Sequence, residues 1–502
     1  MNKTSAAAEP RRENKMGVMP VGRLLFTMAL PMVLSMLMQA LYNIVDSAFV
    51  GMISSENAYG QTALSLAFPV QSLMISFAIG TGVGINSFLS RSLGEKDSEA
   101  VNKSAGNGVF LTFVTYVVFA LLGLFGTRFF FSTQTTIDEV YRSGVDYLFV
   151  VTVFSFGLFT QVLTERLLQA TGKTSLCMVS QMTGALINII LDPVFILKSG
   201  ARILFFDLPF GLGLGTRGAA IATVIGQCVA AALGVILNLT LNREISFKLK
   251  YLKPEGKIIA AIYKVGLPSI FMSAVGAFLT LALNRILTIG EAVKFAVKPE
   301  ETEQIGVTVY GLYFKLQSFV FMPVFGMNNG MIPIVAYNYG ARRKKRIVRT
   351  IVLSLICAVG YMLACLLVFQ FFPKALLGIF HATPAVLQLG VPALRRISLC
   401  FIFAGVCVIS ISTLQALGRG VPSLVISLVR QIVIILPLSY IFAAKIGIDA
   451  VWFAFPIAEF AALAISVIYV IHAYKTQIAP LPDGNTERPE NAGNTLSEGR
   501  SS

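Results

Sequence analysis

Long apolar runs dominate the chain and recur from residue 24 to residue 474. Each is long enough to cross a bilayer as a helix, which takes about 20 residues. Twelve runs stand out, at roughly 24–50, 61–89, 105–126, 145–168, 176–197, 217–241, 259–290, 306–336, 347–371, 391–416, 422–444 and 448–474. They predict an all-α polytopic membrane protein with twelve transmembrane helices. No cleavable signal peptide is expected, because the first run is longer than a signal-peptide core.

Polar side chains interrupt the first run in a regular way. Ser35, Gln39, Asn43 and Asp46 follow one another at steps of four, four and three residues, so they lie on one face of a helix. A carboxyl group inside a span costs about 2.5–3.5 kcal/mol on insertion scales and marks an ion or proton pathway by default. A structural Asp46 that caps a helix or pairs with a lysine is the alternative.

A second acid lies at a similar depth in the fifth run. Asp46 and Asp192 each lie about one turn from the outer ends of their runs. Asn43 and Asn188 are one turn deeper on the same faces, and Thr223 in the sixth run reaches a similar height. Such oxygens could bind a small cation such as Na⁺, or two close carboxyls could share a proton. A hydrogen-bond network that only packs the helices is the third possibility.

The charges fix an expected orientation. The chain is 55% hydrophobic and 13% charged, with a net charge of +15. With the N-terminus inside, 25 of the 40 Lys and Arg residues fall on inner segments or inner helix ends and 11 on outer segments or outer helix ends. This bias is the positive-inside rule. We therefore expect both termini in the cytoplasm, and we attribute the basic run 342–346 to a membrane-facing loop rather than to nucleic-acid binding.

The two halves of the chain repeat each other. Several short motifs recur in the same order at an offset of 246 residues: Gln71-Ser72 with Gln317-Ser318, Gly80, Gly84 and Gly94 with Gly326, Gly330 and Gly340, and Gln169-Ala170 with Gln415-Ala416. An even number of spans per half predicts two six-helix bundles related by an axis along the membrane normal, with a substrate site between them. The expected units are a cytoplasmic segment (1–23), an N-lobe (24–241), a cytoplasmic linker (242–258), a C-lobe (259–474) and a disordered tail (475–502).

The second half has no acid pair of its own. Asn284 falls near the position equivalent to Asp46, and Glu459 in the last run is a single deep acid. Polar or adaptable side chains that could line a substrate path are Gln39, Gln71, Asn284, Lys315, Gln317, Met322 and Met327. Snorkelling or pairing of Lys315, and core packing of the methionines, are the plainer alternatives.

Catalytic chemistry has little support in the sequence. The chain has two histidines and six cysteines, with no CxxC pair, no metal-ligand cluster and no nucleophile motif. We therefore expect a transporter without a cofactor rather than a membrane-embedded enzyme.

Several stretches together resemble the multidrug and toxic compound extrusion (MATE) family. They are LPMVLSMLMQALYNIVDSAFVG (30–51), QATGKT (169–174), NIILDPVFI (188–196) and GTRGAAIATVIGQ (215–227), while FMPVFGMNNGMIPIVAYNYGAR (321–342) is similar to the bacterial MepA-like branch. The resemblance covers roughly residues 20–475. It implies the MATE/MOP-type fold, in which a V-shaped pair of bundles encloses a cavity.

The resemblance also implies a function. It suggests an antiporter of the bacterial inner membrane that works as a monomer and exports amphipathic, cationic drugs in exchange for H⁺ or Na⁺. The family's N-lobe cation site maps onto Asp46, Asn188, Asp192 and Thr223, which would be the metal ligands if Na⁺ is the coupling ion. Acids that other members carry in spans 7 and 10 are absent here. A lipid-linked saccharide flippase of the same superfamily is the alternative, and it would need a more cationic cavity.

Overall fold

The computed structural model describes residues 13–53, 59–200, 202–203, 206–295, 304–380 and 382–482. Helices account for nearly all of this part. Those of the first half are α1 (Lys15–Val18), α2 (Val21–Ile53), α3 (Tyr59–Gly94), α4 (Ser98–Gln134), α5 (Asp138–Val153), α6 (Phe156–Ala170), α7 (Thr174–Ile196) and α8 (Gly215–Leu241). A short antiparallel hairpin of β1 (Arg202–Ile203) and β2 (Phe206–Asp207) lies between α7 and α8.

The second half begins after a single 3-10 turn, η1 (Leu249–Tyr251). Its helices are α9 (Gly256–Phe295), α10 (Ile305–Gly340), α11 (Lys344–Phe371), α12 (Pro373–Gly378), α13 (Pro384–Ser398), α14 (Phe401–Ala416), α15 (Gly420–Leu428), α16 (Leu436–Lys445), α17 (Ile448–Val451) and α18 (Ala454–Ala473). Two π-helical segments, η3 (Val429–Ile435) and η4 (Tyr474–Ile478), follow α15 and α18.

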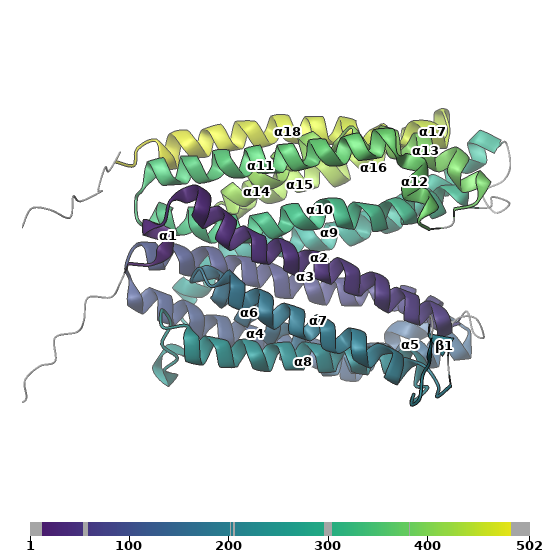
Figure 1. The fold of residues 1–502 in the computed structure, drawn as a ribbon, viewed down its shortest axis with the longest axis horizontal. Coiled ribbons are helices and arrows are strands. Elements are labelled where there is room, and N and C mark those ends of the chain that lie inside the picture. Colours follow the sequence, from purple (N-terminus) through teal and green to yellow (C-terminus); the bar gives the residue numbers. More distant parts are fainter. Residues whose placement is uncertain are drawn as a thin grey trace, which may run out of the picture.

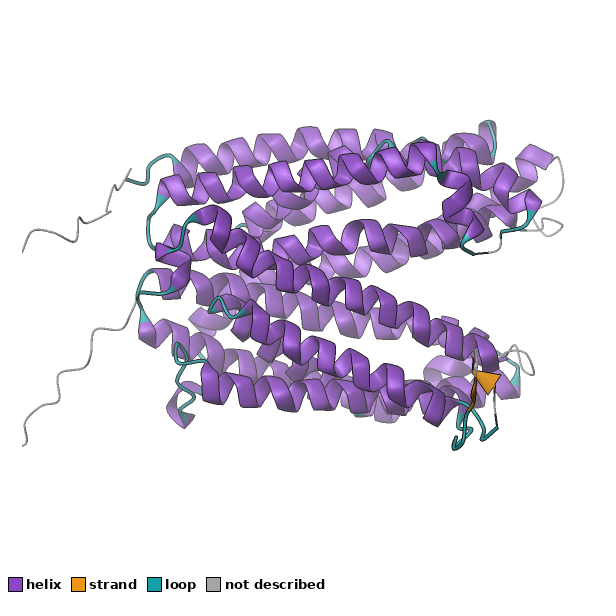
Figure 2. Ribbon diagram, in the orientation of Figure 1, coloured by secondary structure: helices purple, strands orange, loops and turns teal. Residues whose placement is uncertain are grey.

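The helices form two bundles that lie side by side, α2–α8 in one and α9–α18 in the other (Figures 1 and 2). Ten described helices are long and apolar enough to cross a membrane, and α5–α6 and α13–α14 form two further pairs bent by 43° and 48°. Counting each bent pair as one span gives the twelve that the apolar runs predict. Large apolar side chains also cover the outside of the bundles, as Phe125 (79% exposed) and Phe129 (74% exposed) do, which suits a lipid environment.

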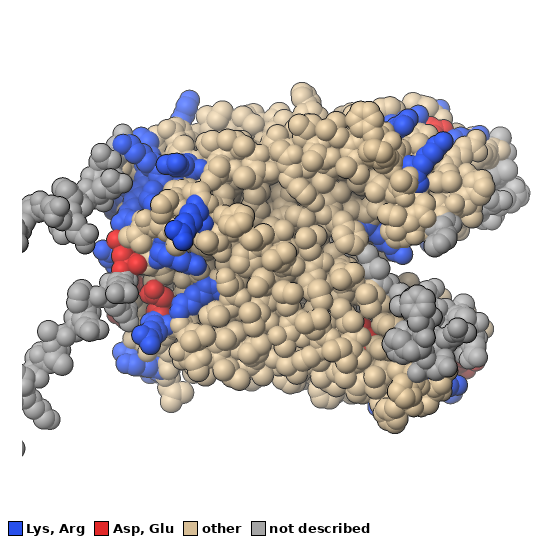
Figure 3. Space-filling model, in the orientation of Figure 1, with Lys and Arg blue, Asp and Glu red and all other residues tan. Residues whose placement is uncertain are grey.

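The two ends of the molecule differ. The first and last described helices, α1 and η4, lie at the same end, where many Lys and Arg side chains gather (left in Figures 1 and 3). We call it the basic end; it includes the run Arg342–Arg346. The β1–β2 hairpin lies at the other end, the hairpin end. The bundles touch at the basic end and are separated by a notch at the hairpin end (Figure 3).

The repeated glycines explain how the bundles meet. In α3, Gly80 and Gly84 face the backbone of α9, and in α10, the equivalent Gly326 and Gly330 face the backbone of α2. An added Cβ at any of the four would overlap or crowd the partner helix. Small residues at these positions therefore let helices of different bundles approach closely. The contact of α3 with α9 and the contact of α10 with α2 are built alike.

The third glycine of each set marks a direct contact of α3 with α10. A Cβ at Gly94 would overlap the carbonyl oxygen of Tyr337, and a Cβ at Gly340 would overlap the carbonyl oxygen of Arg91. The two contacts are reciprocal, as expected of a pseudo-twofold axis. They lie at the basic end, where α3 and α10 both finish.

The short helix α1 bridges the bundles at this end. The amide of Asn14 donates to the carbonyl of Thr171 and to the carboxylate of Glu244, both at 3.1 Å, in the first bundle. On the other side, Arg346 of the second bundle donates to the carbonyl of Met16 at 3.0 Å. Because Met16 is fully buried, the segment forms part of the seal between the bundles.

Candidate functional site

Three of the polar residues singled out in the first half meet inside its bundle. Asn188 and Asp192 lie on α7 and Thr223 on α8, and all three are buried, Asp192 completely. We orient the amide of Asn188 so that both of its polar atoms find partners: Nδ2 then donates to the Asp192 carboxylate at 2.8 Å, and Oδ1 accepts from the backbone N–H of Thr223 at 3.0 Å. In the opposite amide orientation, Nδ2 lies 3.3 Å from the Thr223 hydroxyl. Asn188 therefore joins the carboxylate to the neighbouring helix.

Two glycines bring these short side chains within reach of each other. A Cβ at Gly184 would meet the carbonyl oxygen of Gly226 at 3.0 Å, and a Cβ at Gly226 would meet Cβ of Asn188 at 3.2 Å. Close approach of two helices through small residues is common in membranes. Here it lets Asn188 cross from α7 to α8 and places Asp192 beside the interface.

The first-run residues Asn43 and Asp46 belong to α2, but their side chains lie outside the described part of the structure. Helix α2 packs along α7, the helix that carries Asp192. The donor types of the five predicted residues are carboxylate, amide and hydroxyl, which suit a hard cation. Among the described residues, no group of three or more His, Cys, Asp and Glu side chains could hold a metal ion.

Two predicted substrate-path residues contact neighbouring helices of the first bundle. Gln39 accepts from the amide of Gln181 at 3.4 Å, which joins α2 to α7. Gln71 accepts from the hydroxyl of Tyr147 at 3.3 Å, which joins α3 to α5. Both glutamines are half-buried, so their role in a substrate path stays a prediction.

The predicted substrate-path residues of the second half differ in how far they are buried. Lys315 is exposed on α10, with its ammonium 5.8 Å from the centre of the Phe380 ring. Met327 is buried in the core of the second bundle. The remaining three, Asn284, Gln317 and Met322, are half-buried.

A buried charged pair on α6 includes one acid that sequence reasoning missed. Glu165 and Arg166 are 6% and 7% exposed. Arg166 donates to the side-chain oxygens of Gln169 at 2.9 Å and of Asn329 at 3.0 Å, and the second bond crosses between the bundles. Glu165 accepts from Gln161 at 2.9 Å. The sequence does carry a signal for Glu165, because it is an acid inside the fourth apolar run. It lies near the inner end of that run, however, where acidic residues at a helix terminus are common.

Comparison with known proteins identifies the family of the chain. A family model described as MatE matches residues 31–194 and 301–441, more than half of the chain. The chain belongs to the MatE family. Curated relatives include the multidrug export protein MepA of Staphylococcus haemolyticus, 26% identical over 88% of this chain and 92% of that protein, and MepA of Staphylococcus aureus strain MRSA252, 25% identical over 90% and 94%.

Solved structures show the same fold. A crystal structure of MATE in complex with MaL6 matches with a TM-score of 0.83 at 22% identity and covers 94% of this chain and 99% of that chain. An outward-facing multidrug resistance MATE family transporter of the MOP superfamily matches with a TM-score of 0.83 at 21% identity and the same coverage. As a member of the MatE family with this many candidate spans, the chain is an integral membrane transporter rather than an enzyme.

The C-terminal bundle of this MatE chain holds a largely buried ion pair. Arg430, in the π-helical segment η3, lies 2.9 Å from the carboxylate of Glu459 in α18. The second carboxylate oxygen of Glu459 is buried and has no hydrogen-bond partner among the described residues. Glu459, the single deep acid of the last apolar run, therefore has a basic partner. π-helical turns occur often at functional sites. In this protein the turn contains Arg430, the residue that contacts Glu459.

Glu459→Gln is expected to destabilise this MatE protein, because it leaves the largely buried guanidinium of Arg430 without a counter-charge. Breaking a buried pair on one side costs about 3–5 kcal/mol in soluble proteins. Thermal unfolding in detergent, followed through the fully buried Trp452, measures the loss. The double variant Arg430→Gln/Glu459→Gln should recover most of it. After correction for protein amount, export should fall less than in variants of the aspartates, and an equal fall would move the coupling site to the second bundle.

Proposed function

We propose that the protein is a secondary active antiporter that exports amphipathic, cationic organic compounds in exchange for H⁺ or Na⁺. The observation that carries this proposal is the buried Asp192–Asn188–Thr223 cluster on a MatE-family fold. The curated relatives that match nearly the whole chain are named multidrug export proteins. A negatively charged site in a membrane transporter is suited to carry the coupling ion.

The charge distribution supports an orientation with the basic end in the cytoplasm. Lys and Arg gather at that end (Figure 3), which the positive-inside rule assigns to the cytoplasmic side. The notch at the hairpin end would then face outward. The contacts of Gly94, Gly340 and α1 would close the cytoplasmic side in this state, and we propose that the chain works as a monomer with two lobes, 24–241 and 259–474.

Coupling follows from the chemistry of the first-bundle site. Uptake of H⁺ or Na⁺ at Asp192 and Asp46 would neutralise charge at the contact of α7 with α8 and α2. The hydrogen bonds at this contact would then change, and α2 would pack differently against its neighbours. Because α2 also contacts the second bundle, the side on which the two bundles separate would change with it. Ion and substrate favour opposite states, and the coupling is reciprocal, as any exchanger requires.

The flippase alternative loses support because two of the four cations within the spans (Arg166, Arg285, Lys315 and Arg430) are already engaged. Arg430 pairs with Glu459, and Arg166 donates to Gln169 and Asn329. A diphosphate group would need such cations free in the cavity. The names of the relatives also favour export of drugs.

Efflux of ethidium from energised cells tests the proposal. We expect the wild-type protein to lower cellular ethidium and Asp46→Asn to abolish this activity while reaching the membrane in equal amount. Energised vesicles then separate the ions: an imposed Na⁺ gradient drives uptake only if Na⁺ is coupled, and an imposed pH gradient only if H⁺ is. Well-expressed wild-type protein that moves neither ethidium nor other organic cations would refute drug export.

A further inference from the structure

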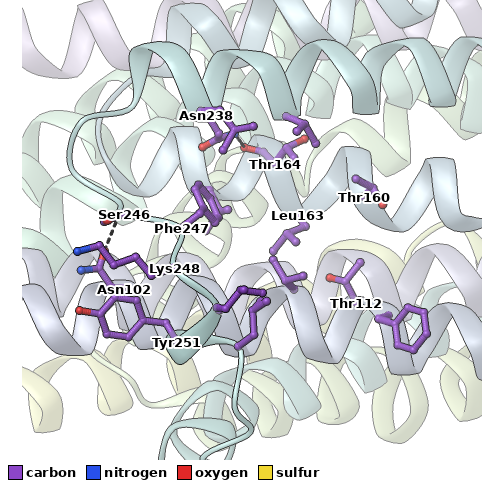
Figure 4. Close-up of a pocket in the computed structure, with 18 of the residues that line it drawn as sticks. Asn102, Thr112, Thr160, Leu163, Thr164, Asn238, Ser246, Phe247, Lys248 and Tyr251 are labelled. Atoms are coloured by element: carbon purple, nitrogen blue, oxygen red, sulfur yellow. Dashed lines mark hydrogen bonds between the residues drawn. The ribbon is translucent and has the colours of Figure 1, made fainter.

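A groove on the first bundle is unrelated to the cluster around Asp192. It has a volume of about 650 Å³, within the usual range of about 300–1,000 Å³ for small-molecule sites. Its described walls come from α4, α6 and α8, and the segment 246–252 closes one end (Figure 4). This segment follows α8 and leads into the second bundle.

The groove is apolar along its length and opens to the outside of the bundle. Among its lining residues, Phe113 and Leu239 are each 62% exposed and Leu249 is 86% exposed. In a membrane-spanning bundle, such side chains face acyl chains. The groove is therefore a recess in a lipid-facing surface, where membrane lipids can enter it.

The closed end is held in a fixed shape. The backbone N–H of Ser246 donates to the side-chain oxygen of Asn102 at 2.7 Å, a bond drawn in Figure 4. On the same side, the amide of Asn238 donates to the carbonyl of Thr164 at 3.0 Å. These bonds engage the side chains of Asn102 and Asn238, and most of the remaining lining surface is apolar.

The chain segment that closes this end is basic. The segment 242–258 holds five basic residues, Arg243, Lys248, Lys250, Lys253 and Lys257, and two acidic ones, Glu244 and Glu255. Both acids already have partners, since Glu244 accepts from Asn14 and Glu255 pairs with Lys103 at 2.7 Å. Lys248 lines the groove, and Lys248, Lys250 and Lys253 are all exposed. An exposed Leu249 between two lysines is typical of a segment that lies in a membrane interface.

We propose that the groove binds a phospholipid with an anionic headgroup. One acyl chain would lie between α4 and α8, over α6, and the phosphate would lie beside Lys248 and Lys250. Apolar walls match the chain, and the excess of positive charge matches the headgroup. Because segment 246–252 connects the bundles, a lipid held there would link the composition of the adjacent leaflet to the bundle interface. This inference is independent of which compound or ion is transported.

A tryptophan reporter can test the proposal on the full chain in detergent micelles. Phe113→Trp places the reporter in the groove, and Phe125→Trp places it on the same helix at an exposed position outside the groove. The native Trp452 is fully buried and gives a constant background. Phosphatidylglycerol or phosphatidylcholine with brominated chains serves as the quencher.

Brominated phosphatidylglycerol should quench the groove reporter at a lower mole fraction than phosphatidylcholine does, while both lipids should quench the Phe125→Trp reporter alike. Each lysine near an anionic surface contributes about a fivefold gain in binding. Lys248→Gln and Lys250→Gln should therefore each raise the phosphatidylglycerol midpoint at the groove reporter by about fivefold. Filling the groove with Thr160→Phe should weaken quenching of Phe113→Trp alone.

Three results would overturn the proposal. Equal quenching of the two reporters would mean that the groove holds no particular lipid. Tight but equal quenching by both lipids would mean that the headgroup is not recognised. Release of the brominated lipid by tetraphenylphosphonium would assign the groove to an organic cation instead.

Discussion

Asp192→Asn should abolish coupled export while leaving the protein inserted and folded. The substitution keeps the volume of the side chain and removes its charge. Asp192 is completely buried and accepts a hydrogen bond from Asn188, so the change removes a group that can gain a proton or bind a cation but little packing. Ethidium efflux from energised cells should fall to the level of cells without the transporter. Substrate binding measured in detergent should persist, because the proposal assigns Asp192 to the ion.

A matched control separates loss of coupling from loss of charge in general. Asp138 lies in the first turn of α5 and is exposed, so Asp138→Asn removes one carboxylate without touching the site. It should export like the wild type. Asn188→Ala should give an intermediate loss, because it removes the bond to the carboxylate but keeps the carboxylate itself. Normal export by both Asp192→Asn and Asp46→Asn would refute the site assignment.

The sequence carried more about this site than about its surroundings. Asp192 and Asn188 were recognisable because a helix places residues four apart on one face, and an acid in an apolar run is costly enough to be informative. Thr223 could be matched only by depth, and the structure places it next to Asn188. The approach of α7 to α8 through Gly184 and Gly226 was not predictable, because which small residues face each other depends on helix rotation.

For the fold, too, some features could be predicted from the sequence and others could not. Twelve spans and a twofold repeat are properties of hydrophobic periodicity and of order along the chain, and both appear in the structure. The bend between α5 and α6, and that between α13 and α14, left no clear mark in composition. The contact of Arg430 with Glu459 also escaped, since it depends on a π-helical turn and on packing between α18 and η3. The repeated glycines were visible in sequence, but only the structure shows that they pack the bundles together.

Gly94→Ala should slow the transport cycle, because it adds one methyl group at the contact between the bundles. Its Cβ would overlap the carbonyl oxygen of Tyr337 in the second bundle, a backbone atom that no side-chain rotation can move. Overpacking costs about 1–3 kcal/mol, which would lower the population of the state closed at the basic end by roughly 5–150-fold. The reciprocal variant Gly340→Ala should act alike, because its Cβ would overlap the carbonyl oxygen of Arg91.

Gly126→Ala is the matched control, because it adds the same methyl group within helix α4 where no atom lies within 4 Å. Ser90→Cys gives the conformational readout, since Ser90 is completely buried near the basic end and donates to the carbonyl of Ala170 at 3.0 Å. In inside-out vesicles, a membrane-impermeant maleimide should label this cysteine faster in the Gly94→Ala background than in the Gly126→Ala background. Unchanged labelling together with normal efflux would show that this contact does not close the basic end. Faster labelling with normal efflux would show that its closure does not limit the cycle.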